Sequence, residues 1–140
     1  MSRILAIDYG TKRTGLAVTD EEKIIARALD TVPTAKVIEY LKSYIIKENV
    51  SMIVIGMPRQ MNNTPSTLTP VVEQFIVKLK KTFSEIPVMT VDERFTSKIA
   101  MQSMLMDGTK KSERRNKGLV DQRSAVLILQ SYMEMQKNNL

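Results

Sequence analysis

The sequence predicts an α/β domain in which a mixed five-stranded sheet is flanked by helices. Five short apolar segments have the composition of strands, and the segments between the later ones have the apolar spacing of helices. Only short polar turns separate the first three, which favours an antiparallel meander. The later strand–helix–strand connections favour parallel pairing with right-handed crossovers. With 140 residues and no internal repeat or linker, we expect a single domain over residues 1–140.

The first three strands are predicted at residues 3–9, 16–18 and 24–26. Residues 4–7 form a continuous apolar run, which is typical of a strand buried on both faces. The run ends at Asp8, and a glycine-containing turn leads to the second strand. A polar turn then precedes the third strand, completing the meander.

Two helices and two strands follow in alternation. Thr34 can cap a helix, whose inward positions are Val37, Ile38, Leu41, Tyr44 and Ile45. An apolar strand at residues 52–56 and a polar loop at residues 57–67 come next. Pro70 suits the first turn of the following helix, whose inward positions are Leu68, Val72, Phe75, Ile76, Leu79 and Phe83. The fifth strand is predicted at residues 87–91.

The last part of the chain is predicted to be helical on both sides of a basic loop. Thr96 can cap a helix that stops at Gly108, where glycine is a common terminator. Residues 108–117 are polar and basic. The final helix is expected over residues 119–136, and much of it should be buried because it is apolar nearly all round near its middle.

Composition limits the chemistry available to this chain. It contains no histidine and no cysteine, which excludes Ser–His and Cys–His nucleophile pairs and any disulfide or thiolate site. Carboxylates prefer hard cations, so an enzyme of this composition points to Mg²⁺ or Mn²⁺. The formal charge of +6 and the pI near 9.6 favour a polyanionic partner such as nucleic acid. No apolar run is long enough to span a bilayer, and no signal peptide is apparent, so we expect a cytoplasmic protein without membrane partners.

Three acidic positions stand where predicted elements end or begin. Asp8 closes the first strand, where it either opens a turn or is a partly desolvated functional group. Asp92 and Glu93 follow the fifth strand, and only one of them should face a given site unless both are solvated. Asp121 is expected in the first turn of the last helix, where the helix dipole alone would favour an acid. Small residues three and four positions later, Ser124 and Ala125, are expected to leave open space beside it. Three such acids could together hold two divalent ions.

Basic residues cluster just before Asp121. The members of this basic segment are Lys110, Lys111, Arg114, Arg115 and Lys117. They form either a solvated loop or an arm that contacts phosphates, and Lys12 and Arg13 in the first turn could extend the arm. Few aromatic residues are available for stacking on bases; Tyr9 and Phe95 are nearest to the acids in sequence.

Four ordered segments make the chain resemble a known family. They are IDYGTKRTGLA (residues 7–17), VIGMP (54–58), VDERFTS (91–97) and DQRSAVLILQ (121–130). Together they resemble the YqgF-type family of pre-16S rRNA nucleases, relatives of the RuvC-type Holliday junction resolvases. The resemblance covers nearly the whole chain and implies a ribonuclease H-like fold. It also implies metal-dependent endonuclease activity on structured nucleic acid, here the 5′ end of precursor 16S rRNA.

The resemblance assigns roles to individual residues. The family's acidic triad falls on Asp8, Glu93 and Asp121 as catalytic and metal-binding residues, which favours Glu93 over Asp92. The family's first-turn arginine falls on Arg13 as a phosphate contact. The remaining nucleic-acid contacts that we expect are Lys12, Arg59, Arg94, Lys110, Lys111, Arg114, Arg115 and Lys117. The loop at residues 59–64 departs from the family pattern, losing an acid and gaining Arg59, so its substrate contacts should differ.

Alternative functions stay open at this point. Branched DNA could replace rRNA as substrate, as in a Holliday junction resolvase. A non-catalytic ribosome-maturation factor could keep the acids for metal-assisted RNA binding. The turn at residues 8–11 also resembles the phosphate-binding turn of actin-like and sugar-kinase ATPases, although those bind ATP between two such domains. The chain itself is expected to act as a monomer or a weak homodimer.

Overall fold

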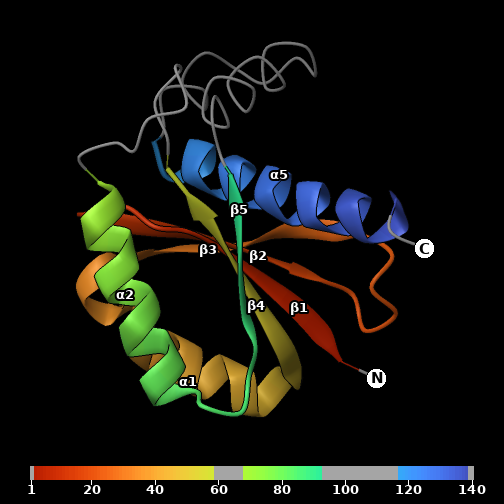
Figure 1. Ribbon diagram of the computed structural model, residues 1–140, viewed down its shortest axis with the longest axis horizontal. Helices are drawn as coiled ribbons and strands as arrows, with labels where there is room; N and C mark the ends of the chain where they lie inside the picture. The colour runs from red at the N-terminus through yellow and green to blue at the C-terminus, as the bar shows by residue number, and fades with distance from the viewer. Residues whose placement is uncertain (1, 59–67, 93–116, 139–140) are drawn as a thin grey trace.

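The computed structural model describes residues 2–58, 68–92 and 117–138. Its centre is a mixed five-stranded sheet, as predicted, and the structure gives the strand order β3-β2-β1-β4-β5 (Figure 1). The strands are β1 (Arg3–Asp8), β2 (Arg13–Thr19), β3 (Ala26–Pro33), β4 (Val50–Met57) and β5 (Val88–Asp92). The helices are the short 3-10 helix η1 (Thr34–Lys36), α1 (Val37–Glu48), α2 (Thr69–Thr82) and α5 (Lys117–Asn138).

Chain connections determine how the strands pair. Short turns join β1, β2 and β3, which pair in antiparallel fashion. The connection from β1 to β4 passes through α1, and that from β4 to β5 passes through α2, and both pairs are parallel. The three parallel strands therefore end at the same edge of the sheet, with Asp8, Met57 and Asp92 as their last residues. We call this edge the carboxyl edge.

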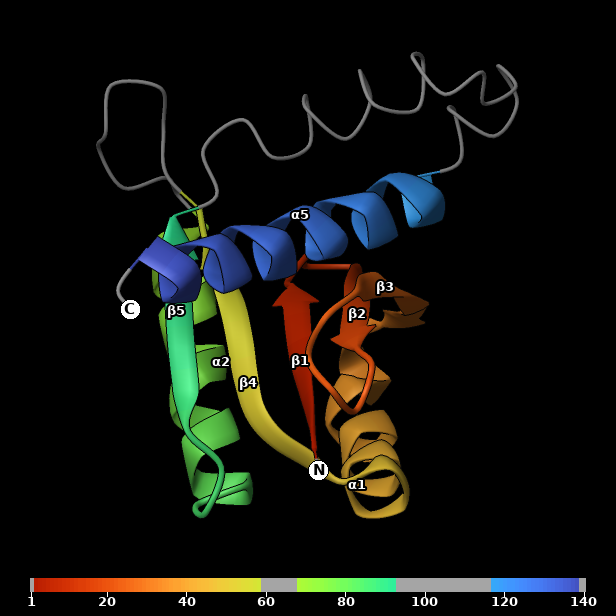
Figure 2. The same ribbon diagram turned by 90° about the vertical axis from the view of Figure 1, so that its right-hand side faces the viewer.

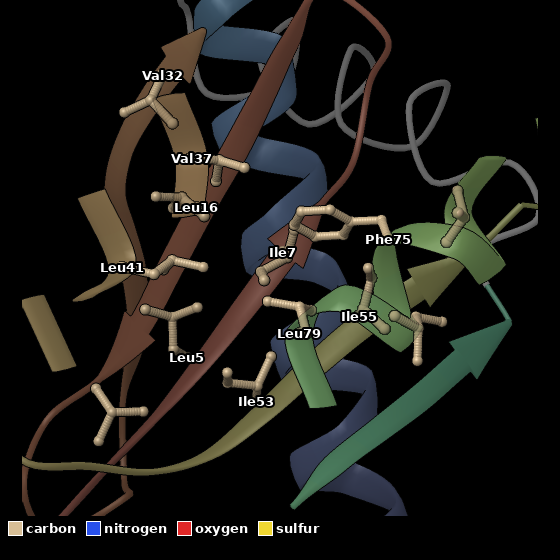
Figure 3. Close-up of a cluster of buried hydrophobic side chains, with 13 residues drawn as sticks. Leu5, Ile7, Leu16, Val32, Val37, Leu41, Ile53, Ile55, Phe75 and Leu79 are labelled. Carbon is tan, nitrogen blue, oxygen red and sulfur yellow. The ribbon is translucent and has the colours of Figure 1, made fainter. Parts of the chain in front are cut away.

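The sheet has a hydrophobic core on each face. Leu5 and Ile7 of β1 face α1 and α2, with which they form the larger core shown in Figure 3. Ile4 and Ala6 face the other way, towards α5. Figure 2 shows α5 crossing the strands on the face opposite to α2, and α5 contacts all five strands. Among the described helices, none is both long and apolar enough to cross a membrane.

The third strand was predicted in the wrong place. It was expected at residues 24–26, but β3 begins at Ala26, and the side chains of Ile24 and Ile25 are 64% and 62% exposed. The carboxylate of Asp20 accepts hydrogen bonds from the backbone N–H groups of both isoleucines, at 2.7 and 2.9 Å. These bonds, chiefly the one from Ile25, lower the pKa of Asp20. The isoleucines therefore belong to a turn closed by an acid, and their hydrophobicity alone was misleading.

The helix start near Thr34 was also wrong. Thr34 belongs to η1, and the N-cap of α1 is Lys36, which makes no capping hydrogen bond through its side chain. The strand β2 begins at Arg13, three residues before its predicted start, whereas β1, β4, β5, α2 and α5 lie within two residues of their predicted bounds. Pro70 occupies the first turn of α2 as expected. The helix predicted from Thr96 to Gly108 lies outside the described residues.

Candidate active site at the carboxyl edge

Asp8 lies at the carboxyl edge on the side of the sheet covered by α5. It is the last residue of β1, and alternation along the strand places it on the same face as Ile4 and Ala6, which pack against α5. Across the antiparallel ladder it is paired with Gly15 of β2. Asp8 is only partly buried, so its carboxylate is within reach of solvent and of ligands.

Asp121, a residue of α5, lies close to Asp8 on the same side of the sheet. A Cβ atom at Gly15 would overlap the backbone carbonyl of Asp121 and would lie 2.9 Å from the Cβ of Asp121. Directly opposed residues in an antiparallel pair have Cβ atoms about 4.5–5.5 Å apart, so the Cβ atoms of Asp8 and Asp121 are separated by roughly 8 Å at most. The absence of a side chain at Gly15 thus brings together two acids that are far apart in the sequence.

Two expectations about Asp121 need correction. The helix α5 begins at Lys117, not at residue 119, and its first turn contains no acid, so Asp121 lies beyond that turn. The helix dipole is therefore a weaker reason for an acid at this position. Ser124 and Ala125 do not leave open space, because both are fully buried. Their small size allows α5 to pack closely on the sheet.

Arg13 and Asp121 form an ion pair across the site. The Nε atom of Arg13 donates to Oδ2 of Asp121 at 2.6 Å, and the two side chains are 37% and 21% exposed. Charge-assisted hydrogen bonds of this length are stronger than neutral ones. The sequence predicted Arg13 as a phosphate contact, and the structure shows that Arg13 also pairs with Asp121. Lys12, beside it in the turn, is exposed.

The turn that carries Arg13 is held in place by Thr34. The hydroxyl of Thr34 donates to the carbonyl of Gly10 and shares a 2.9 Å hydrogen bond with the hydroxyl of Thr14, which is fully buried. The backbone N–H of Thr34 also donates to the carbonyl of Lys12 at 3.0 Å. These bonds explain why Thr34 is not a helix cap: its side chain and its backbone both fasten the turn between β1 and β2.

Replacing Thr34 by valine should destabilise the protein and loosen this turn. The substitution keeps the shape but leaves the carbonyl of Gly10 and the hydroxyl of Thr14 without their partner, which should cost about 1–3 kcal/mol. Urea unfolding measures the loss. Thr82→Val is the matched control, because the exposed Thr82 hydroxyl bonds only within α2, to the carbonyl of Lys78. Equal effects of the two substitutions would show that Thr34 has no special role.

Of the two neighbouring acids after β5, Asp92 lies within the described residues. Asp92 is exposed and follows Val91, which packs on the α5 side, so strand alternation directs Asp92 towards the opposite face. Glu93 lies outside the described residues. Within residues 2–58, 68–92 and 117–138, no three acidic side chains gather closely enough to hold a metal ion together. The described part of the site consists of Asp8, Asp121 and Arg13.

Most predicted nucleic-acid contacts also fall outside the described residues. These are Arg59, Arg94, Lys110, Lys111, Arg114 and Arg115, whereas Lys117 is the first residue of α5. Tyr9 packs against Phe75 with ring centroids 4.5 Å apart, so it contributes to the core beneath the site.

Sequence reasoning missed Gly15 and Thr34. An isolated glycine within a strand is a recognised signal of close backbone approach, and it could have identified Gly15. No comparable sequence signal distinguishes Thr34 from an ordinary helix cap.

The described donor set suits a hard divalent cation. Asp8 and Asp121 offer carboxylate oxygens, the ligands that Mg²⁺ and Mn²⁺ prefer. Both side chains are partly accessible, and both lie at the carboxyl edge of a sheet, where ligands commonly bind in α/β proteins. The two residues therefore fit part of such a site.

The sheet topology, the helices on both faces and the acids at the carboxyl edge define the chain as a ribonuclease H-like protein. Two solved structures of Thermus thermophilus RuvC share this fold. One, in complex with a Holliday junction substrate, has a TM-score of 0.57 at 19% identity and covers 97% of each chain. The other has a TM-score of 0.53 at 16% identity, with 96% of each chain covered.

The family follows from closer relatives. The model of the family described as "RuvX: Holliday junction resolvase" matches residues 2–135, and the chain belongs to this family. A Parabacteroides distasonis protein is 51% identical over all 140 residues of both chains. A Bacteroides thetaiotaomicron protein is 52% identical over 137 residues, or 98% of this chain and 99% of its own. Both relatives are named as candidate pre-16S rRNA nucleases.

Proposed function

We propose that this chain is a cytoplasmic, divalent-metal-dependent nuclease that hydrolyses phosphodiester bonds in the precursor of 16S rRNA. The observation that carries the proposal is the meeting of Asp8 and Asp121 over Gly15 at the carboxyl edge. Its substrate is suggested by the names of relatives that match the chain over its full length at about half identity. Its reaction class is suggested by the family as a whole.

In this proposal the acids hold the metal, and the basic residues hold the substrate. Asp8 and Asp121 supply ligand oxygens, and Glu93 is the third ligand expected from the resemblance. A bound Mg²⁺ or Mn²⁺ supplies activation of a water and charge neutralisation at the scissile phosphate. Asp8 has a fixed direction because it stands on a strand of the central sheet, and Asp121 because its helix is packed on that sheet. Preorganised ligands of this kind need little rearrangement during the reaction.

Branched DNA is the second candidate substrate. The family description names a Holliday junction resolvase. The chain also shares its fold with a RuvC structure that contains a Holliday junction. The two substrates differ in the 2′-hydroxyl and in helix geometry, and the acids themselves do not discriminate between them.

Turnover measurements test the proposed function directly. Purified protein is incubated with end-labelled fragments of precursor 16S rRNA and with four-way DNA junctions, in Mn²⁺, Mg²⁺ or EDTA. We expect metal-dependent cleavage of the rRNA fragment near the mature 5′ end. Preferential cleavage of the junction would replace rRNA by DNA as substrate. Tight RNA binding without turnover in either metal would support a maturation factor that does not cleave.

Replacing Lys110 and Lys111 by alanine should weaken nucleic-acid binding and flatten its dependence on salt. Each lost phosphate contact should reduce the slope of log K against log salt by about 0.7–0.9, whatever the sequence of the ligand. Fluorescence anisotropy at several salt concentrations measures the slope. The matched control is Lys80→Ala with Lys81→Ala, two exposed lysines in the last turn of α2. Equal slopes for the two double variants would mean that residues 110 and 111 contribute only net charge.

A further inference from the structure

The ion pair between Arg13 and Asp121 joins a residue expected to bind phosphate to a residue expected to bind metal. The two residues are 108 positions apart in the sequence, and the 2.6 Å hydrogen bond between them is made through Nε of the guanidinium. Both side chains are partly buried, at 37% and 21% exposure, so water screens the pair less than it would on an open surface. The ion pair is therefore expected to contribute more free energy than the same pair would on an open surface.

The pair leaves part of the guanidinium for another ligand. Arginine has five N–H donors, and its terminal nitrogens are well suited to a phosphate. Within the described residues, Nε is the only side-chain atom of Arg13 that makes a hydrogen bond. The turn that carries Arg13 is fastened by Thr34, so the side chain swings from a fixed backbone position. Arg13 can therefore exchange Asp121 for a phosphate without movement of the fold.

A divalent cation and Arg13 compete for the same carboxylate. When a cation binds Asp121, the guanidinium either leaves or stays beside a second positive charge, and both outcomes reduce metal affinity. When a phosphate of the substrate binds Arg13, the carboxylate is released and the local positive charge is offset. The two binding events are linked thermodynamically. If bound nucleic acid raises the affinity for metal by some factor, bound metal raises the affinity for nucleic acid by the same factor.

We propose that Arg13 is a counter-ion for Asp121 in the metal-free protein and that its transfer to a substrate phosphate couples nucleic-acid binding to metal binding. The inference rests on the proposed function, because it requires metal at Asp121. It adds that the site has low metal affinity until nucleic acid arrives.

Metal affinity of the free protein is the first measurement. Mn²⁺ is titrated calorimetrically into the wild type, Arg13→Gln and Lys12→Gln. We expect Arg13→Gln to bind Mn²⁺ about tenfold more tightly, because the carboxylate of Asp121 loses its charged partner. Lys12→Gln removes the same charge from an exposed neighbour in the same turn and should change affinity by less than about threefold. Should Arg13→Gln fail to fold, Arg13→Lys keeps the charge but loses the Nε geometry, and it should tighten binding severalfold.

Coupling is the second measurement. The dissociation constant of a hairpin RNA is measured by anisotropy, with and without saturating Mn²⁺, over times at which a denaturing gel shows that the RNA is intact. We expect Mn²⁺ to tighten RNA binding about fivefold to tenfold in the wild type, but less than about twofold in Arg13→Gln. Lys12→Gln should bind RNA more weakly overall, because Lys12 is an expected phosphate contact, but Mn²⁺ should tighten its binding by the wild-type factor. General effects of Mn²⁺ on the RNA are the same for all three proteins and cancel in the comparison.

Several outcomes would overturn the inference. Unchanged or weaker Mn²⁺ binding by Arg13→Gln would mean that the ion pair only positions Asp121. Equal coupling in Arg13→Gln and the wild type would mean that Arg13 does not link the two ligands. Asp121→Asn separates this inference from the proposed function: if it binds Mn²⁺ as the wild type does, the proposed metal site is wrong, and the inference falls with it. If Asp121→Asn loses Mn²⁺ and Arg13→Gln resembles the wild type, the inference alone is wrong.

Discussion

Asp8→Asn should abolish cleavage without unfolding the protein. The substitution removes a metal ligand and its charge from the end of a central strand, so activity should fall by roughly 10³-fold or more. In EDTA the variant should melt at or above the wild-type temperature, because the described site then holds one acid paired with Arg13 in place of two acids beside a single arginine. Mn²⁺ at about 100 times its dissociation constant should stabilise the wild type by about 2.7 kcal/mol and the variant very little.

Asp92→Asn is the matched control for this prediction. It is the same chemical change at the same edge of the sheet, but Asp92 is exposed and strand alternation turns it away from the α5 side. It should keep wild-type cleavage and the wild-type response to Mn²⁺. A purely structural role for Asp8 would instead lower its melting temperature in EDTA and preserve the response to metal. Wild-type cleavage by Asp8→Asn, in preparations free of contaminating nucleases, would disprove the mechanism.

Gly15→Ala should both destabilise the protein and disturb the site. The new methyl group would meet the backbone carbonyl of Asp121, which cannot rotate away as a flexible side chain would. The helix α5 must therefore move off the sheet, at an expected cost of about 1–3 kcal/mol and a fall in melting temperature of roughly 5–10 °C. Because Asp121 moves with the helix, stabilisation by Mn²⁺ should also shrink. Thermal melts with and without Mn²⁺ measure both effects.

Ala28→Val is the control for adding methyl groups to a strand. Ala28 is exposed on β3, and the change should stay within about 0.5 kcal/mol. The comparison separates the loss of packing at Gly15 from any general effect on strand propensity. If Gly15→Ala were as stable as Ala28→Val and kept its response to Mn²⁺, the close approach of α5 to β2 would not be needed to position Asp121.

The type and order of the five strands and of α1, α2 and α5 could be predicted from the sequence, and so could the chemistry available to the site. Continuous apolar runs identified β1 and β4, because strands buried on both faces need no alternation. An apolar run also identified the edge strand β5, although Val91 is its only buried residue. Helical spacing identified α1 and α2, and the absence of histidine and cysteine left carboxylates as the candidate ligands. The pattern failed at Ile24 and Ile25, because hydrophobicity does not reveal that Asp20 closes a turn around their backbone.

Which of these residues contact one another depends on the tertiary fold. Nothing local to Asp121 indicates that Arg13 is its partner or that Gly15 lies beneath its carbonyl, since these contacts join segments that lie far apart along the chain. Nor does the sequence show that Thr34 fastens the first turn instead of capping a helix. Such contacts depend on the pairing of β1 with β2 and on the packing of α5 over both strands. The spacing of apolar residues indicates which face of a helix or strand is buried. It does not indicate which residues of other elements pack against that face, because this depends on the arrangement of all the elements.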